Sequence, residues 1–157
     1  MNISFGFDHG AYDISSTVHE LLESLGHTVT TYGAESSTST DYFPDFAHRV
    51  AEDVVNNHAQ YGILICGSGN GMAMTANKHP AIRAGLAWNR EIARLARYHN
   101  DANILCLPAR FITPKELKNC INIFLSTPFE GGRHCGRISR IDSRDDTSQY
   151  MDAALTP

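Results

Sequence analysis

The sequence predicts an α/β fold in a single domain spanning residues 1–157, with a parallel sheet covered by helices. Short apolar or β-branched runs alternate along the chain with segments whose apolar residues recur at helical spacing. One of these runs, residues 63–65, is continuously apolar, which is typical of a strand buried on both faces of a parallel sheet. The length of the chain suits one compact domain with a single core.

The first half of the chain is expected to hold three strands and two helices. The strands are predicted at residues 3–7, 28–32 and 61–66. The first helix would begin with Asp13 as its N-cap and end at Gly26. The apolar stripes of the two helices are Ile14, Val18, Leu21, Leu22 and Leu25 in the first, and Phe46, Ala47, Val50, Ala51 and Val54 in the second.

The second half continues the alternation and ends in a helical tail. Helices are predicted at residues 72–78 and 91–98, and strands at residues 83–88 and 103–107. A further helix opens at Thr113, with Pro114 in its first position and Glu116 completing a capping box. Its predicted buried stripe is Leu117, Cys120, Ile121, Phe124 and Leu125. The polar segment 130–157 is expected to be helical in part and to pack on a neighbouring subunit.

Five strands with intervening helices indicate a parallel sheet with right-handed crossovers, that is, a Rossmann-like three-layer sandwich. The expected strand order is 2-1-3-4-5, which places a ligand crevice at the carboxyl ends of the first and third strands. Asp8 and His9 follow the first strand and Cys66 ends the third, so these residues are expected at one crevice. The other candidate residues named below are expected to gather at the same edge of the sheet.

The charge and hydropathy of the chain exclude several classes of partner. Thirteen Lys and Arg against seventeen Asp and Glu give a net charge of −4, with no long run of either sign. Bulk attraction to nucleic acid or to an anionic membrane is therefore not expected. No apolar stretch is long enough to span a membrane, and the N-terminal residues lack the features of a signal peptide, so a cytoplasmic location is expected.

The cysteine and histidine spacing predicts neither a disulfide framework nor a metal site. No Cys-x-x-Cys pair is present among Cys66, Cys106, Cys120 and Cys135, which are interpreted as reduced thiols. The eight histidines form no His-Glu-x-x-His pattern, so no metal and no cofactor is expected.

The segment from Cys66 to Gly71 is the most informative one for chemistry. Its glycines Gly67, Gly69 and Gly71 allow backbone N–H groups to surround an anion just before a helix N-terminus. The segment lacks the Lys of a P-loop, which disfavours nucleoside triphosphates. A thiol in this position favours the thiolate form. The competing interpretations are a simple tight turn, and a Cys66 that only ends a buried strand.

Four other groups are candidates, each with a structural alternative. Asp8 and His9 can bind sugar hydroxyls or a phosphate, or simply form a capped turn. His99 can act as an acid or base, or lie solvated at a helix end. Arg133 and Arg137, one helical turn apart, can address one phosphate or form an ordinary basic face. Arg110 can line the same crevice or make a surface ion pair.

Five motifs together resemble ribose-5-phosphate isomerase type B, in the group that also contains galactose-6-phosphate isomerase subunits. The resemblance runs from about Asn2 to Arg140, nearly the whole chain. The motifs are Gly6-Phe7-Asp8-His9, Ile65-Cys66-Gly67-Ser68-Gly69-Asn70-Gly71, Ala76-Asn77-Lys78, His99-Asn100-Asp101-Ala102-Asn103 and Glu130-Gly131-Gly132-Arg133-His134. It implies interconversion of ribose 5-phosphate and ribulose 5-phosphate through an enediolate, without metal.

The resemblance also implies a role for each candidate residue. Cys66 would move the proton between C1 and C2, and Ser68 would relay protons between O1 and O2. Backbone N–H groups near Gly67, Gly69 and Gly71, together with Asn100, would hold the enediolate oxygen. His99, with Asp8, would open the sugar ring. His9, Arg110, Arg133 and Arg137 would hold the phosphate. Similar proteins are dimers or tetramers with sites between subunits, which implies a homodimer or homotetramer here.

Some members of the group use a carboxylate from the following helix as the base. Here that helix begins Met72-Ala73-Met74-Thr75, which leaves Cys66 as the base. Many members also have Tyr directly before the proline of the second helix, where this chain has Phe43 before Pro44, with Tyr42 one residue displaced and Asp45 as another candidate for ring opening. This segment leaves a six-carbon sugar phosphate open as the substrate. A non-catalytic sugar-phosphate sensor is the alternative from another class.

Overall fold

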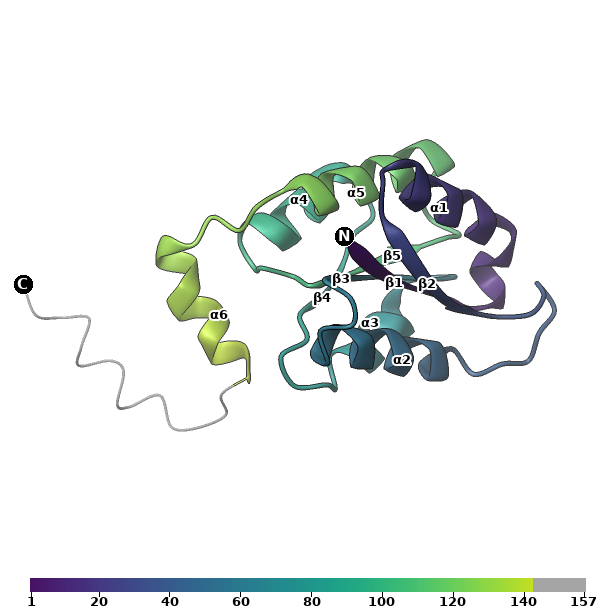
Figure 1. The fold of residues 1–157 in the computed structure, drawn as a ribbon, viewed down its shortest axis with the longest axis horizontal. Coiled ribbons are helices and arrows are strands. Elements are labelled where there is room, and N and C mark those ends of the chain that lie inside the picture. Colours follow the sequence, from purple (N-terminus) through teal and green to yellow (C-terminus); the bar gives the residue numbers. More distant parts are fainter. Residues whose placement is uncertain (143–157) are drawn as a thin grey trace, which may run out of the picture.

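Five parallel strands form one sheet in the computed structural model of the chain, which describes residues 1–142 (Figure 1). The strands are β1 (Asn2–Phe7), β2 (Thr28–Gly33), β3 (Tyr61–Cys66), β4 (Ala84–Leu86) and β5 (Ile104–Pro108). Every neighbouring pair is parallel. The predicted α/β class, the parallel sheet and the central position of β1 and β3 are confirmed.

The predicted strand order is wrong at one end of the sheet. The order is β2-β1-β3-β5-β4, so β5 lies between β3 and β4. All five residues of β5 are buried, whereas β4 has three half-buried residues, which suits an edge strand. The side-chain amide of Asn77 bonds both the N–H and the carbonyl of Ala84, and so covers part of the exposed edge of β4. β5, which is buried on both faces, therefore lies inside the sheet, and β4 lies at its edge.

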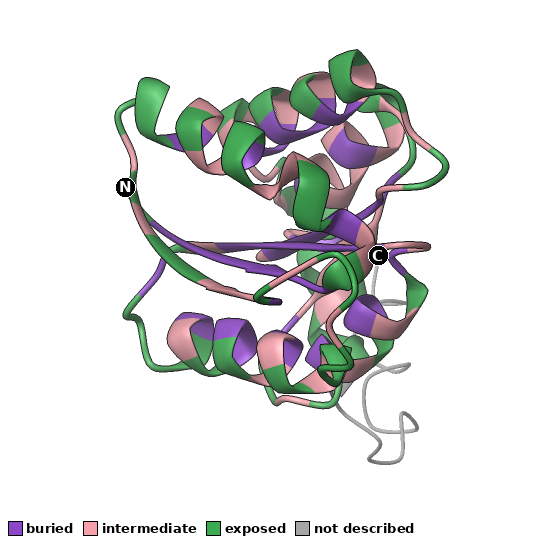
Figure 2. Cartoon of the chain, turned by 90° about the vertical axis from the view of Figure 1, so that its right-hand side faces the viewer, coloured by how far each residue is buried: buried purple, intermediate pink, exposed green. Residues whose placement is uncertain are grey.

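Helices cover both faces of the sheet. One layer contains α1 (Tyr12–Ser24), α4 (Arg90–Tyr98) and α5 (Pro114–Ser126), and the other contains α2 (Phe43–Val55) and α3 (Asn70–Ala76) (Figure 1). The strands are buried between the inward-facing sides of the helices (Figure 2). Alternate strand residues serve the two cores, so Ile63 and Ile65 pack beneath the first layer while Leu64 and Cys66 pack beneath the second.

Two predicted helix caps differ in the structure. Asp13 is not the N-cap of α1, because the helix begins at Tyr12 with Ala11 as its N-cap, after a 3₁₀ turn (His9–Ala11) that Asp8 caps by accepting a hydrogen bond from the N–H of Gly10. Thr113 does cap α5, accepting a hydrogen bond from the N–H of Glu116 at 3.2 Å. Glu116 completes no capping box, since its carboxylate accepts from the N–H of Arg90 and so joins α5 to the start of α4.

The C-terminal segment begins with a 3₁₀ turn (Gly132–His134) and continues as α6 (Cys135–Asp142), which confirms a partly helical tail. This helix stands to one side of the sandwich (Figure 1), and Ile141 near its end lines a hollow together with Arg83 and Ala84 of the sandwich. Residues 143–157 of the predicted tail lie outside the described part of the chain. Within residues 1–142, no helix is long and apolar enough to cross a membrane.

Candidate active site

A cleft of about 440 Å³ opens at the carboxyl ends of β1 and β3, where the sequence predicts it. The predicted residues that line it are Asp8, His9, Cys66, Gly67, Ser68, Gly71 and Arg110, and two aromatic residues, Phe43 and Phe111, complete its wall. These side chains come together because parallel strands end at the same edge of the sheet. The structure thus confirms the proximity of these candidates.

The glycine-rich loop points a backbone N–H at the Cys66 sulfur. The N–H of Gly69 donates to Sγ at 3.1 Å, and the sulfur is buried at the end of β3. Gly69 has φ +75°, and a Cβ there would lie 2.4 Å from a methyl carbon of Leu86 and 3.1 Å from the carbonyl carbon of Leu107. Only glycine fits this position. A donor aimed at sulfur stabilises negative charge on it, which suits a thiol that exchanges protons.

Arg110 brings a positive charge directly over the loop. The backbone N–H of Arg110 donates to the carbonyl of Gly67 at 3.1 Å, and the backbone N–H of Ala109 donates to the carbonyl of Cys66 at 2.9 Å. A Cβ on Gly67 would lie 3.2 Å from Nε of Arg110, so the guanidinium packs against the bare glycine backbone. The cleft therefore combines backbone donors with a nearby cation, an arrangement that binds anions.

Asp8 supplies a buried carboxylate at the same edge. It is 7% exposed, and Oδ1 accepts from the N–H of Gly10 at 2.9 Å. Burial raises the pKa of the Asp8 carboxyl above its usual 3.8, against the opposing effects of His9, the Gly10 N–H and Arg110. A carboxyl group whose protonated form is favoured in this way, inside a cleft, is suited to acid–base chemistry.

The segment that departs from the family pattern forms one wall of the cleft. The Phe43 ring lies against Gly71, since a Cβ on Gly71 would come within 2.6 Å of the ring. Tyr42 is 76% exposed, and Asp45 is exposed in the first turn of α2. Of these three residues, only Phe43 lines the cleft. This wall therefore presents a phenyl ring to a ligand instead of a phenol hydroxyl.

The other candidates lie at the opposite edge of the sheet, and the expectation of a single cluster is wrong. His99 and Asn100 follow α4 and precede β5, so they lie at the amino end of that strand. Arg110 lies beyond its carboxyl end, and the five residues of β5 span roughly 15 Å. Since α4 runs back from the carboxyl edge to the amino edge, its last residues cannot reach the cleft of the same chain.

Arg133 joins the amino-edge group, because the segment that carries it folds back onto the end of α4. The N–H of Glu130 donates to the carbonyl of Tyr98 at 2.9 Å, and the rings of His99 and His134 stack with centroids 4.5 Å apart. Arg133 is exposed beside His134, while Arg137 is exposed on α6. The sequence predicts no role for Glu130 or His134 beyond membership of a motif, although their separation of four residues is a signal for a side-chain pair.

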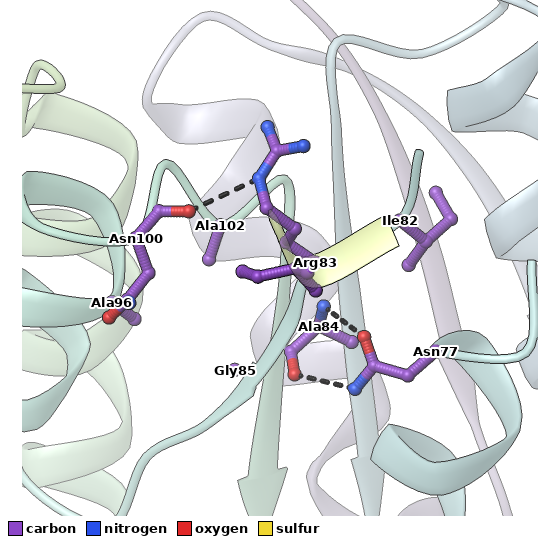
Figure 3. Close-up of a pocket in the computed structure, with 9 residues that line it drawn as sticks. Asn77, Ile82, Arg83, Ala84, Gly85, Ala96, Asn100 and Ala102 are labelled. Atoms are coloured by element: carbon purple, nitrogen blue, oxygen red, sulfur yellow. Dashed lines mark hydrogen bonds between the residues drawn. The ribbon is translucent and has the colours of Figure 1, made fainter. Parts of the chain in front are cut away.

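The loop that carries His99 and Asn100 is held by two arginines. Asp101 has φ +45°, and its carboxylate accepts from Arg97 at 2.7 Å and from Arg83 at 2.9 Å. Figure 3 shows Arg83 Nε donating to the carbonyl of Asn100, beside a hollow of about 350 Å³. In the same view the Asn77 amide bonds only the backbone of Ala84. This hollow lacks the thiol, carboxylate and imidazole groups of the carboxyl-edge cleft.

Among the described residues, His99, Glu130 and His134 place possible metal-binding atoms within 4.8 Å of one another. The two imidazole planes are nearly parallel, 13° apart. A tetrahedral zinc ion needs each ligating nitrogen at about 2.0–2.1 Å with its lone pair directed at the metal. The lone pairs of stacked rings lie in two separate, nearly parallel planes and do not converge on one ion, so this cluster does not fit a zinc ion.

The sequence profile of the Ribose/Galactose Isomerase family matches residues 3–141. The chain belongs to this family. A probable ribose-5-phosphate isomerase B from Mycoplasma pneumoniae is 40% identical over 134 residues, 85% of this chain and 88% of that protein. The chain is an enzyme, an aldose–ketose isomerase.

Solved structures of this family share the fold. A ribose 5-phosphate isomerase from Thermotoga maritima superposes with a TM-score of 0.85 at 44% identity, covering 90% of this chain and 97% of that one. A ribose-5-phosphate isomerase B from Mycoplasma genitalium with bound ribulose-5-phosphate superposes with a TM-score of 0.85 at 38% identity, covering 96% of each chain.

Proposed function

We propose that the protein interconverts ribose 5-phosphate and ribulose 5-phosphate through an enediolate, with Cys66 as the base. The observation that carries the proposal is the Gly69 N–H directed at Cys66 Sγ, in a cleft that also holds a buried carboxyl group and an arginine. An enediolate mechanism needs a base, donors for a developing oxyanion and an anchor for the phosphate. The cleft offers Cys66 as the candidate base and the backbone N–H groups of the glycine loop as candidate donors. Arg110 and His9 are candidates for part of the phosphate anchor.

In the proposed reaction the Cys66 thiolate removes the proton from C2 of the open-chain aldose, and negative charge develops on O1. The N–H groups of the glycine loop and the amide of Asn100 stabilise that charge. Ser68 transfers a proton from O2 to O1, and the thiol then returns its proton to C1, which gives the ketose. His99, assisted by Asp8, opens the furanose ring before this step.

We further propose that two copies of the chain complete each site, in a homodimer or homotetramer. One copy would supply the carboxyl-edge cleft, and its neighbour would supply His99, Asn100, Arg133 and Arg137. The support is geometric, because each chain holds these two groups at opposite edges of its sheet and carries α6 as an arm beyond its own sandwich (Figure 1). Because sugar phosphates are charged and do not cross membranes, we assign the activity to the cytoplasm.

The first test is isomerisation of ribose 5-phosphate by the wild type, Cys66→Ala and a matched Cys120→Ala control. Both thiols are buried, but Cys120 lies in α5 away from the cleft. We expect turnover in the wild type and the control and a loss of at least about a hundredfold in Cys66→Ala. Inorganic phosphate should still inhibit any residual activity. A Cys66→Ala variant as active as the control would refute the assigned base.

The second test mixes two impaired variants. Cys66→Ala and His99→Asn would each damage both sites of a homodimer, whereas a mixed dimer would contain one site with both native residues. Random exchange of subunits should restore about one quarter of wild-type activity. A site built within one chain would give no recovery on mixing, even when mass spectrometry shows that mixed oligomers have formed.

The six-carbon alternative rests on the Phe43 wall of the cleft. A phenyl ring cannot hydrogen-bond a sugar hydroxyl, so it offers less discrimination among chain lengths than a phenol would. Comparison of kcat/KM for ribose 5-phosphate, allose 6-phosphate and galactose 6-phosphate decides between a five-carbon and a six-carbon substrate. Binding of all three without turnover would favour the non-catalytic sensor.

A further inference from the structure

The His99 imidazole rests on a second imidazole that is itself fixed. The His134 side chain is 6% exposed, and its ring lies nearly parallel to that of His99 with a centroid separation of 4.5 Å. His134 Nε2 lies 2.8 Å from Oε2 of Glu130. Glu130 is anchored in turn, because its N–H donates to the carbonyl of Tyr98, the residue before His99. The ring of His99 is thus restrained through a closed set of contacts.

The contacts of His134 Nε2 determine which atom is the donor. A carboxylate only accepts hydrogen bonds, so the 2.8 Å contact requires a hydrogen on Nε2. Arg133 Nε lies 3.3 Å from the same nitrogen, but an N–H cannot donate to a nitrogen whose lone pair is replaced by hydrogen. The carboxylate contact is shorter and charge-assisted, so it prevails.

An unrestrained histidine at a helix C-terminus would sample several rotamers. His99 is the C-cap of α4 and is only partly buried, so its own helix does not fix its ring. The buried His134 ring supplies a flat surface that favours one orientation of the His99 plane. Since proton transfer requires the donor within hydrogen-bond reach of the sugar oxygen, this orientation controls the rate of the step that His99 performs.

We propose that Glu130 and His134 are positioning residues for ring opening, with Glu130 fixing His134 and the stacked His134 ring orienting His99. This inference rests on the proposed function, in which His99 opens the furanose ring. Neither residue needs to touch the substrate in this role. Within one chain both residues lie at the sheet edge opposite Cys66, and neither is assigned to the proton transfer at C2. Removing the Glu130 carboxylate should therefore leave the carboxyl-edge cleft and the proton transfer at C2 intact.

The test is a double-mutant cycle with Glu130→Gln and His99→Asn. Glu130→Gln should lower kcat for ribose 5-phosphate about tenfold, with a change of less than twofold in inhibition by inorganic phosphate. In the His99→Asn background the same substitution should have less than a twofold effect, because it acts through His99. Glu130→Asp should recover part of the rate. Glu23→Gln is the matched control, since Glu23 also pairs with a histidine four residues away, but on the exposed surface of α1.

Two results would overturn the inference. One is a Glu130→Gln variant within twofold of the wild type. The other is a double variant whose losses multiply, which would show that Glu130 acts independently of His99. A wild type without turnover is a different failure, that of the proposed function. The same four proteins are then compared by urea unfolding. If Glu130 and His99 are coupled, the shifts in the urea midpoint of the single variants do not add up to that of the double variant; if they are uncoupled, the shifts add.

Discussion

Replacing Arg97 with methionine removes a guanidinium that is buried between α4, α5 and β3 and that holds the loop of His99 and Asn100. Arg97 is 5% exposed. Its NH1 donates to the carboxylate of Asp101 and to the carbonyl of Ala102, each at 2.7 Å. The guanidinium carbon lies 4.8 Å from the ring centroid of Tyr61 and 5.9 Å from that of Phe124. Methionine fills a similar space without any of these polar contacts.

The expected loss of stability follows from these contacts. The hydrogen bond to the buried Ala102 carbonyl contributes about 1.5–3 kcal/mol, and the cation–π contacts about 1 kcal/mol. The Asp101 carboxylate is 31% exposed and keeps Arg83, so its ion pair adds only about 1 kcal/mol after solvent screening. Against this, the substitution removes the buried Arg97 Nε, which has no hydrogen-bond partner among the described residues, and relieves about 1–3 kcal/mol. The net loss is about 2 kcal/mol.

Urea unfolding and thermal melts of Arg97→Met measure this loss. A loss of 2 kcal/mol lowers Tm by about 4–8 °C in a chain of this length. The control is Arg94→Met in the same helix, where the arginine is 35% exposed, pairs with Glu91 and lies over the Tyr98 ring, and we expect a smaller loss of stability. Isomerase activity should fall in Arg97→Met below its new Tm, because Asp101 loses one of its two anchors. A variant as stable as the wild type would refute the assignment of Arg97 as an anchor of this loop.

Two further substitutions test the cleft. Burial raises the pKa of the Asp8 carboxyl, so the ionised form destabilises the folded chain at neutral pH. Asp8→Asn should therefore be more stable than the wild type above the folded-state pKa, lose that advantage as the pH falls from the folded-state pKa to 3.8, and have lower activity; urea midpoints across pH check this. Gly71→Ala places a Cβ 2.6 Å from the Phe43 ring, so it should raise KM while α3 remains folded, and Phe43→Leu should restore KM; an unchanged KM in Gly71→Ala would contradict the close packing of that wall.

The central part of the fold is predictable from local pattern, whereas the strand order at one end is not. Helical spacing and the buried run of β3 indicate parallel strands flanked by helices, and the chain order places β1 beside β3. The choice between β4 and β5 as the edge strand depends on which one is apolar on both faces in three dimensions. The amide of Asn77, which covers Ala84, is seven residues away in sequence and gives no periodic signal.

The candidate site divides in the same way. Asp8, Cys66 and Arg110 follow strands, so the rule that ligands bind at carboxyl ends brings them together correctly. His99 and Asn100 precede a strand, and the same rule places them at the other edge. The capping box at Glu116 fails for a related reason, because its carboxylate has a tertiary partner, the N–H of Arg90, that local sequence cannot reveal.

The positions of the arginines at the two edges of the sheet indicate what the C-terminal arm, residues 132–142, would contribute to the proposed assembly. The carboxyl-edge cleft has one arginine, Arg110, over its loop, and a doubly charged phosphate is better held by several cations. The remaining arginines of the proposed anchor, Arg133 and Arg137, are exposed at the opposite edge of the sheet, on the segment that follows the contact of Glu130 with the end of α4. Ile141 on the same segment lines the hollow beside Arg83 and Ala84 of its own sandwich, yet its side chain is still 54% exposed, which is unfavourable in water. An arm that lies across a second copy would bury this apolar side chain and deliver both cations, so association and phosphate binding would be stabilised by the same contacts.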